Sequence, residues 1–180
     1  MKTKILITGI AGFIGSQIAY KLAESQTNII YGIDNLVTGK ISNVPKRKNI
    51  KFIKGDLSKK KTFDKIKFKA EYILHFAGQS SGEKSYYDPV QDLNNNTLTT
   101  INLINYGIKC KSKKIVYASS VSVYGNSKKK IYTESDNPKP ISCYGISKVA
   151  SEYYLKVYSN KLPFTILRLF NIFGIGQDMN

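Results

Sequence analysis

The residue types best suited to chemistry are a tyrosine and a lysine in the sequence Tyr144-Gly-Ile-Ser-Lys148. Positions four apart share one face of a helix, so we expect the phenol and the ammonium to enter one pocket. A free phenol has a pKa of about 10, so a base that acts near neutral pH needs a decrease of about 3 units, or ~4 kcal/mol. Neighbouring cations favour the charged phenolate and lower its pKa. The alternative is an ordinary exposed pair, because the chain contains 13 tyrosines and many lysines.

Ser120 is the third candidate, because it follows an apolar stretch at 114–119. A hydroxyl at that position would donate to a substrate oxygen or relay a proton to Tyr144. The alternative is a serine that satisfies the backbone at the end of a strand, which is common in any protein.

Gly9, Gly12 and Gly15 follow the apolar run Ile5-Leu-Ile7. Glycine lacks a Cβ, so it allows positive φ and close approach of another group to the backbone. A helix that begins here presents free N–H groups and the positive end of its dipole, which suits a pyrophosphate. The spacing is not Gly-x-Gly-x-x-Gly, so an ordinary strand–turn–helix connection is the alternative.

Two carboxylates follow predicted strands. Asp34 is placed to accept hydrogen bonds from an adenosine ribose, and its charge would repel a 2′-phosphate, which favours NAD over NADP. A loop-capping role for Asp34 is equally compatible with the sequence. Asp56 alone decides little, because it also suits a cap for the following helix.

Metal and triad chemistry find no support. His75 is the only histidine and lies among apolar residues within a predicted strand, which favours a structural role. No histidine or cysteine cluster is available for a metal, and nothing pairs His75 with a nucleophile. Cys110 and Cys143 lie far apart, which predicts free thiols in a reducing cytoplasm.

The elements that position these residues alternate along the chain. We predict strands at 5–7, 28–34, 51–56, 72–76, 114–119 and 163–169, and helices at 13–24, 60–67, 88–106 and 144–158. The first helix buries Ile14, Ile18 and Leu22, and the third buries Leu93, Leu98, Ile101 and Ile104. The third strand belongs near a sheet edge, because its outer positions are charged.

Strands that alternate with helices predict an α/β fold, a doubly wound parallel sheet of the Rossmann type in three α/β/α layers. The carboxyl ends of all its strands lie along one edge, where ligands bind. Six polar features follow predicted strands and therefore share that edge: Gly9, Asp34, Asp56, Ala77-Gly78, Ser120 and Asn171.

Length and composition fit one globular domain over residues 1–180, with 42% hydrophobic residues. No apolar run reaches the roughly 20 residues of a membrane span, and we expect no signal peptide. The net charge of +16 comes almost entirely from lysine, with short runs at 59–61 and 128–130. Nucleic-acid binding would group arginine and aromatic residues on one face, so we expect a solvated lysine-rich surface instead.

Taken together, the motifs resemble the extended short-chain dehydrogenase/reductase superfamily, in its NAD-dependent nucleotide-sugar epimerase/dehydratase branch. The resemblance extends over essentially the whole chain in family order. The matching segments are Thr8–Gly15, Asp34–Leu36, Gly55–Leu57, His75–Gly78, Ser119–Gly125, Tyr144–Lys148 and Arg168–Asn171.

The resemblance implies a tightly held NAD. Residues of the glycine turn (Gly9, Gly12, Phe13, Ile14 and Gly15) would hold its pyrophosphate side. The adenosine would contact Asp34, Asn35, Asp56 and Leu57, and further contacts would come from Phe76, Ala77, Gly78 and Asn96. The glycine usual three positions after that asparagine is Thr99 here.

The resemblance also implies the catalytic roles. Tyr144 would take the proton of a sugar hydroxyl while NAD removes hydride from the same carbon. Lys148 would bind the nicotinamide ribose and, with the oxidised ring, lower the pKa of the tyrosine. Ser120 would bind the reacting hydroxyl, and Asn171 would contact the phosphates of the substrate.

The branch includes several reactions. Dehydratases resemble one another in placing Asp and Glu directly after the active-site hydroxyl, because elimination of water needs an extra acid and base. Val121 and Ser122 occupy these places, so 4-epimerisation of a UDP-sugar is favoured. A UDP-sugar decarboxylase, a dehydratase or a keto-sugar reductase remains an alternative.

Relatives continue beyond the position of Asn180 into a smaller lobe that grips the nucleotide and closes over the sugar. We therefore expect this chain to lack most of the substrate lobe and to have little activity alone. A non-catalytic NAD-binding module is an alternative from another class, and a basic nucleic-acid-binding domain is a weaker one. Relatives pair through helices that correspond to 88–106 and 144–158, which suggests a homodimer.

Overall fold

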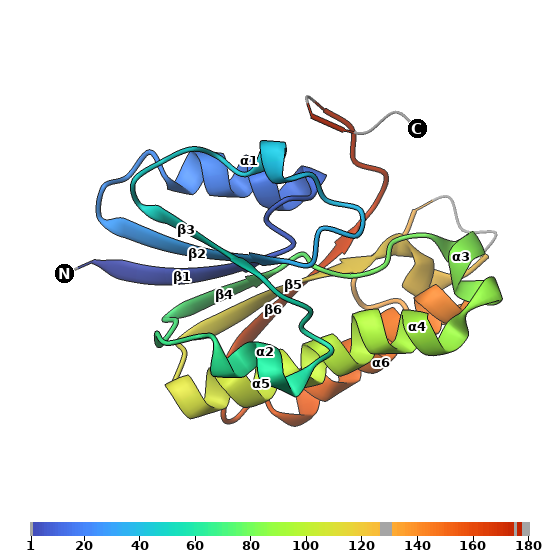
Figure 1. The fold of residues 1–180 in the computed structure, drawn as a ribbon. Coiled ribbons are helices and arrows are strands. Elements are labelled where there is room, and N and C mark those ends of the chain that lie inside the picture. Colours follow the sequence, from blue (N-terminus) through green and yellow to red (C-terminus); the bar gives the residue numbers. More distant parts are fainter. Residues whose placement is uncertain (1, 127–130, 175, 178–180) are drawn as a thin grey trace.

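The computed structural model describes residues 2–126, 131–174 and 176–177. Within them, parallel strands form one sheet in the order β3-β2-β1-β4-β5-β6 (Figure 1). The strands are β1 (Thr3–Thr8), β2 (Asn28–Asp34), β3 (Ile50–Lys54), β4 (Tyr72–His75), β5 (Lys114–Ser120) and β6 (Phe164–Leu169). The predicted Rossmann-type sheet is confirmed, and β3 lies at an edge as its charged outer residues indicated.

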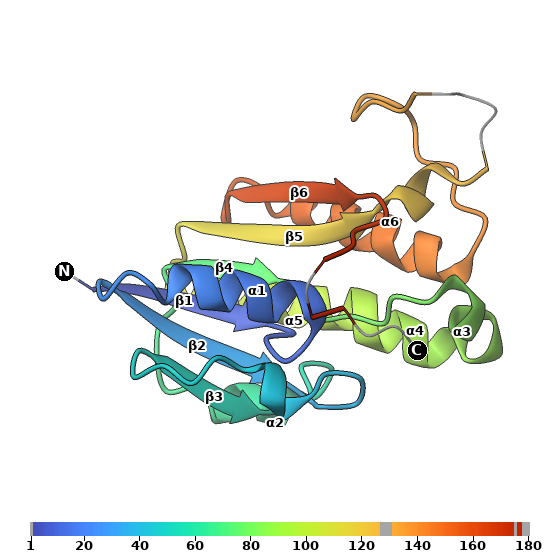
Figure 2. The same cartoon turned by 90° about the horizontal axis from the view of Figure 1, so that it is seen from above.

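Helices cover both faces of the sheet and give the three predicted layers (Figures 1 and 2). Helix α1 (Phe13–Leu22) lies on one face, together with the short 3-10 helix η1 (Ile41–Asn43). The opposite face carries α2 (Lys60–Asp64), α4 (Pro89–Leu93), α5 (Thr99–Cys110) and α6 (Cys143–Val157). The strand order reverses between β1 and β4, which makes the carboxyl ends of these two strands the place for a ligand.

Side chains alternate across the strands, so each face of the sheet has its own core. Ile5, Ile7 and Ile30 pack with Ala19 beneath α1. Leu6, Ile73, Ile115 and Leu103 pack on the opposite face. Of the residues predicted for the buried side of α1, Ile18 and Leu22 are partly buried against the first of these cores.

The long helix predicted at 88–106 is interrupted and extends further than expected. Asp88 caps α4 by accepting from the amide of Gln91 at 2.8 Å, and Pro89 occupies its first turn. A π-helical turn, η2 (Asn94–Leu98), joins α4 to α5, which ends only at Cys110. Lys111 then takes a left-handed conformation with φ of 56° and ends the helix.

The apolar stripe predicted for that helix is partly wrong. Leu93 is 52% exposed, whereas Asp92 and Asn96 are buried at 1%. The polar side chains of the first half hydrogen-bond to each other and to α6, so they fill the buried face that the sequence pattern gave to leucine. Ile104 is fully buried as predicted, together with Leu103.

Besides η1, two short helices were not expected. Helix α3 (Gly82–Tyr87) begins at Ser81, whose hydroxyl accepts from the amide of Lys84 at 3.2 Å. The 3-10 helix η3 (Val121–Tyr124) follows β5 directly. The lysine run at 128–130 lies outside the described residues. Cys110 and Cys143 are free thiols as predicted, and no helix in the described part of the chain is long and apolar enough to span a membrane.

Candidate active site

The glycine turn between β1 and α1 is a cradle that side chains would fill. Gly9 has a φ of +70°, and a Cβ there would lie 2.7 Å from the amide nitrogen of Ala77. A Cβ at Gly15 would lie 2.1 Å from the carbonyl oxygen of Gly9. Gly12 begins α1 without any side-chain cap, so N–H groups of the first turn are left for an anion.

Asp34 adopts the loop-fixing role that the sequence left open. One carboxylate oxygen accepts from the amide of Ala11 and the other from the amide of Leu36, both at 2.9 Å. Each oxygen keeps a second lone pair, so the same carboxylate also suits a ribose. Asn35 is exposed, and its side chain accepts from the amide of Val37 at 3.0 Å.

Asp56 fixes the turn that leads to α2. Its carboxylate accepts from the amide and the hydroxyl of Ser58, at 2.9 and 2.7 Å. Leu57 is buried, and its carbonyl accepts from the side chain of Asn102 at 2.9 Å. The segment therefore holds its backbone at the carboxyl edge of the sheet between β3 and α2.

Tyr144 and Lys148 lie on the first half of α6, which begins where Ser142 accepts from the amide of Gly145 at 3.0 Å. Both are buried, at 8% and 6% exposure, and the Lys148 ammonium lies 5.6 Å from the centre of the Tyr144 ring. Lys148 donates to the carbonyl of Ala118 at 3.0 Å. Its Nζ is 3.4 Å from the position of a Cβ on Gly78, so the pair adjoins the segment that packs on Gly9.

In the protein alone, the pKa of Tyr144 lies above its ordinary value. Burial raises the pKa of the phenol and the nearby Asp92 carboxylate raises it further, while contact with Ser120 only partly opposes them. Burial also lowers the pKa of Lys148 to about 8, against the attraction of Asp92 and Glu152. The ammonium is itself poorly solvated and lies near two carboxylates, so the phenolate needs a second cation.

Ser120 ends β5 and caps η3, which is the backbone-satisfying role that the sequence left open for this serine. Its hydroxyl accepts from the amide of Ser122 and donates to the Ser122 hydroxyl, both at 3.1 Å. Its contact with Tyr144 favours the ionised phenol. Ser122, which stands where a dehydratase has an acidic residue, is thus the hydrogen-bond partner of Ser120.

Asp92 was missed by the sequence analysis. Its carboxylate accepts from the Ser147 hydroxyl at 2.6 Å and from the side-chain amide of Asn96 at 2.9 Å. Asn96 is therefore turned so that its Oδ1 has no partner among the described residues and lies 2.5 Å from the Cβ position of Gly78. The signal available in the sequence was the spacing of four between Asp92 and Asn96.

His75 joins the two sides of the site through buried hydrogen bonds. The Ala77 amide donates to Thr8 Oγ1 at 3.2 Å, and Thr8 contacts His75 Nδ1 at 2.8 Å. On the other side, His75 Nε2 contacts Thr100 Oγ1 at 3.1 Å, and Thr100 donates to the Asn96 carbonyl at 2.8 Å. Each threonine has one proton, so Thr8 donates to Nδ1 and the ring donates from Nε2.

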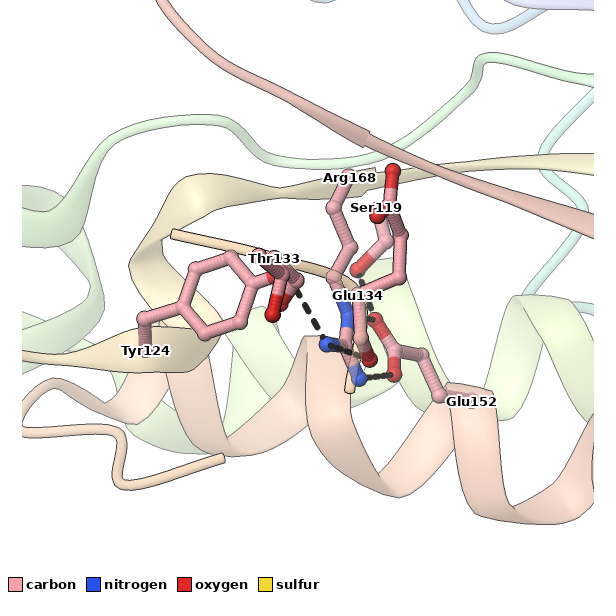
Figure 3. A network of polar contacts seen from close by, with 6 residues as sticks. All are labelled: Ser119, Tyr124, Thr133, Glu134, Glu152 and Arg168. Atoms are coloured by element: carbon pink, nitrogen blue, oxygen red, sulfur yellow. Dashed lines mark hydrogen bonds and ion pairs between the residues drawn. The ribbon is translucent and has the colours of Figure 1, made fainter. Parts of the chain in front are cut away.

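A further network ties β6 to α6 (Figure 3). Arg168 contacts Glu152 through Nε at 3.0 Å and Nη2 at 2.8 Å, and its Nη1 donates to Tyr124 and to the carbonyl of Glu134. Ser119 donates to the same Glu152 carboxylate at 2.6 Å. The strand that ends in Ser120 is thereby fastened to the helix that carries Tyr144.

The remaining predicted site residues lie at the same edge of the sheet, and only their positions and exposure bear on a site. Asn171 follows β6 and is exposed. Phe13 and Ile14 open α1 and are partly buried, as are Phe76 and Ala77. No group of three potential ligands for a metal ion occurs within the residues that the structure describes.

Comparison with known proteins gives a consistent picture. Residues 5–180 match the model of the NAD dependent epimerase/dehydratase family. The chain is 40% identical over 179 residues to a Methanocaldococcus jannaschii protein named as a candidate UDP-glucose 4-epimerase, with 97% of this chain and 57% of that protein covered. The chain therefore spans little more than half the length of the curated relative that it matches.

Solved structures of the same group superpose closely. The UDP-glucose 4-epimerase of Thermotoga maritima with UDP-glucose gives a TM-score of 0.92 at 34% identity, covering 98% of this chain and 58% of that one. The UDP-glucose 4-epimerase of Thermus thermophilus in complex with NAD gives 0.92 at 35% identity, covering 99% and 58%.

Proposed function

The chain belongs to the NAD dependent epimerase/dehydratase family, and from this premise we propose that residues 1–180 form the NAD-binding catalytic domain of a nucleotide-sugar 4-epimerase. The substrate that we propose is a UDP-sugar. One observation carries the proposal: Tyr144 and Lys148 are buried together beside Gly78 at the carboxyl edge of the sheet.

The residues present suit a dinucleotide. The glycine turn leaves a space that a Cβ at Gly9 or Gly15 would close. Asn96 Oδ1 is buried without a partner in the described part of the chain, and the Lys148 ammonium lies on the same side of Gly78. Such groups need polar contacts to offset their burial. A ribose and a carboxamide offer the donors and acceptors that these groups lack.

Each residue then has a defined part. The first turn of α1 binds the pyrophosphate, Asp34 and Asn35 the adenosine ribose, and Asp56 with Leu57 the adenine. Phe13, Ile14, Phe76 and Ala77 line the same cofactor, and Asn96 and Lys148 hold its nicotinamide side. When bound, NAD supplies reversible hydride acceptance at the reacting carbon.

The protein's own chemistry is proton transfer. Ser120 donates to the oxygen at the reacting carbon, and Tyr144 takes the proton from that oxygen and later returns it. Lys148 stabilises the phenolate, and Asn171 contacts the phosphates of the nucleotide. No carboxylic acid follows Ser120, because Val121 and Ser122 stand there, which favours epimerisation over dehydration.

We also propose that the protein acts in the cytoplasm as a homodimer. Apolar side chains gather on the exposed sides of α4 and α6: Val90 is 68% exposed, Tyr153 55% and Val157 71%. These two helices contact each other, and we propose that a second copy packs against their exposed sides. Sedimentation of the chain with and without Val157→Glu tests the dimer, and an unchanged monomer in both would contradict it.

The function is tested by incubation with UDP-glucose, UDP-galactose and their N-acetyl forms, followed by chromatography of the products. The assay uses this chain and the same chain extended by the C-terminal part of a relative. We expect the extended chain to interconvert one pair, and Tyr144→Phe to abolish turnover while NAD binding persists. Absence of interconversion with NAD bound would favour a non-catalytic module, and retained turnover in Tyr144→Phe would refute the base.

A further inference from the structure

A cavity lies between α2, the segment that follows it, and α5. Its volume is about 750 Å³, within the range of small-molecule sites. It is lined by Phe63, Phe68 and Tyr106 but by none of the residues placed at the glycine turn or around Tyr144. Neither the proposed reaction nor the cofactor uses this cavity.

The aromatic wall of this cavity is held in place before any ligand arrives. The Phe68 ring stacks on Tyr31 with ring centres 3.4 Å apart, and it meets the edge of Tyr106 at 6.4 Å. The Tyr106 hydroxyl donates to the Phe68 carbonyl at 2.9 Å and accepts from the Ala70 amide at 3.2 Å. Both hydrogen-bonding capacities of the hydroxyl are used, so Tyr106 offers the cavity its ring. A flat apolar body would find a rigid surface there.

The charge around the opening has one sign. Five exposed lysines line the cavity against a single carboxylate, that of Asp64: Lys4, Lys60, Lys67, Lys69 and Lys109. Long lysine stems lie along apolar surface and keep their ammonium groups in water, so they suit the rim of an apolar cavity. Neutral or cationic ligands would leave this charge uncompensated, whereas an anion would balance it.

We infer that this cavity binds a small amphipathic anion, with a planar aromatic body against Phe68 and Tyr106 and a sulfonate, carboxylate or phosphate head among the lysines. The site is independent of the proposed catalytic function. The cavity adjoins the proposed cofactor site at one point. Asn102 lines the cavity, and its side-chain amide donates to the carbonyl of Leu57 at 2.9 Å.

Three probes of one shape test the charge rule: 1-naphthalenesulfonate, the neutral 1-naphthalenemethanol and the cationic 1-naphthylmethylammonium. Each is titrated into the ¹⁵N-labelled chain at about 0.15 M salt, where the Debye length is about 8 Å, and followed by amide chemical shifts. We expect the sulfonate to bind about tenfold more tightly than the alcohol, with the cation weakest, because several ammonium groups attract the head. The shifts should lie in 60–69 and 102–110.

Variants separate this cavity from the general charge of the protein. Lys67→Glu with Lys109→Glu should weaken sulfonate binding about tenfold. The control variant Lys156→Glu with Lys161→Glu makes the same change in net charge, on α6 and just after it. It should change the affinity for the sulfonate less than about twofold, because salt screens distant charges. Asn105 is exposed and lines the cavity, so Asn105→Trp should fill it and block binding without loss of the fold.

Equal affinity for the three probes would overturn the proposal. So would chemical-shift changes that map to β6, or equal losses of affinity in the two lysine pairs, since either would show unspecific attraction. Sulfonate binding that survives Asn105→Trp would place the ligand elsewhere and refute this cavity.

Discussion

Arg168 and Glu152 form an almost fully buried ion pair, with side-chain exposures of 10% and 1% and a shortest N–O distance of 2.8 Å. The pair connects β6 with the helix that carries Tyr144 and Lys148, while Ser119 donates to the same carboxylate. The hydrogen bonds to Glu152 raise the pKa of the Arg168 guanidinium, and the Glu152 carboxylate also favours the charged form of Lys148. The ion pair therefore holds α6, and with it Tyr144 and Lys148, in position against the sheet.

Removing one partner of this ion pair should lower the free energy of unfolding more than removing both partners. Arg168→Met leaves a buried carboxylate without its partner and should lower the free energy of unfolding by about 3–5 kcal/mol. The double variant Arg168→Met with Glu152→Met removes that charge and should be more stable than the single variant. Urea unfolding measures both. Lys21→Met, which breaks an exposed pair with Glu24, serves as control and should be silent. A double variant less stable than Arg168→Met would contradict the argument.

A second prediction contrasts two glycines that differ in the space around them. A Cβ at Gly15 would meet the Gly9 carbonyl oxygen at 2.1 Å, whereas nothing lies within 4 Å of a Cβ at Gly82. Gly15→Ala should therefore destabilise the chain by roughly 1–3 kcal/mol and displace the glycine turn. Gly82→Ala should leave stability unchanged or raise it slightly. Thermal unfolding of both variants checks the contrast, and an equal effect would refute close packing in the turn.

Much of the fold followed from the sequence. The strand at 28–34 was predicted with its observed bounds, because an apolar run ended by a polar loop has few alternatives. Apolar runs also located β4, β5 and β6 to within one residue at each end. Local patterns of this kind fix strands that are covered on both faces.

What escaped the sequence depends on contacts between distant elements. Asp92 was not singled out in the sequence, and its burial is compensated by hydrogen bonds that Ser147 on α6 and Asn96 donate to it. The π-turn at Asn94–Leu98 has no periodic signature in the sequence, and it lies against α6, which is distant in the chain. The raised pKa of Tyr144 reflects burial, which spacing alone does not reveal.

The third prediction concerns the protonation of His75. Its ring is fully buried, and burial together with Lys148 lowers its pKa to about 3. It should therefore remain neutral at pH 5, with the proton on Nε2 as the two threonines require. Because the chain has one histidine, a ¹⁵N-histidine spectrum reports it directly.

The sign of the accompanying stability change follows from the same pKa. The unfolded chain takes up a proton near pH 6.5 and the folded chain only near pH 3, so stability falls as the pH drops through this window, by up to about 1.4 kcal/mol per pH unit. A protonated imidazole at pH 5 in the folded chain, or a proton on Nδ1, would contradict the hydrogen-bond chain.

The fourth prediction concerns Lys148, whose pKa burial lowers to about 8. Between pH 8 and about 10.4 the unfolded chain holds a proton that the folded chain has lost, so this group adds stability as the pH rises. Lys148→Met lacks this change. From pH 7 to pH 10, the free energy of unfolding of wild type should therefore rise by about 1–3 kcal/mol relative to that of Lys148→Met. Urea titrations at both pH values measure it. A difference that is flat with pH would show that the folded ammonium titrates normally.

The last prediction concerns how Tyr144 becomes a base. Burial and Asp92 raise the pKa of its phenol in the protein alone, and Lys148 does not reverse this. An oxidised nicotinamide carries the missing positive charge, and a charge within 4–6 Å lowers a pKa by about 1–3 units. We therefore expect the ultraviolet difference titration of wild type against Tyr144→Phe to show tyrosinate above pH 10 without cofactor, and at least about one unit lower with saturating NAD⁺. NADH has a neutral ring and should leave the titration unshifted. An equal shift with NADH would attribute the change to closure of the site rather than to charge, and no shift with bound NAD⁺ would remove Tyr144 from its proposed role.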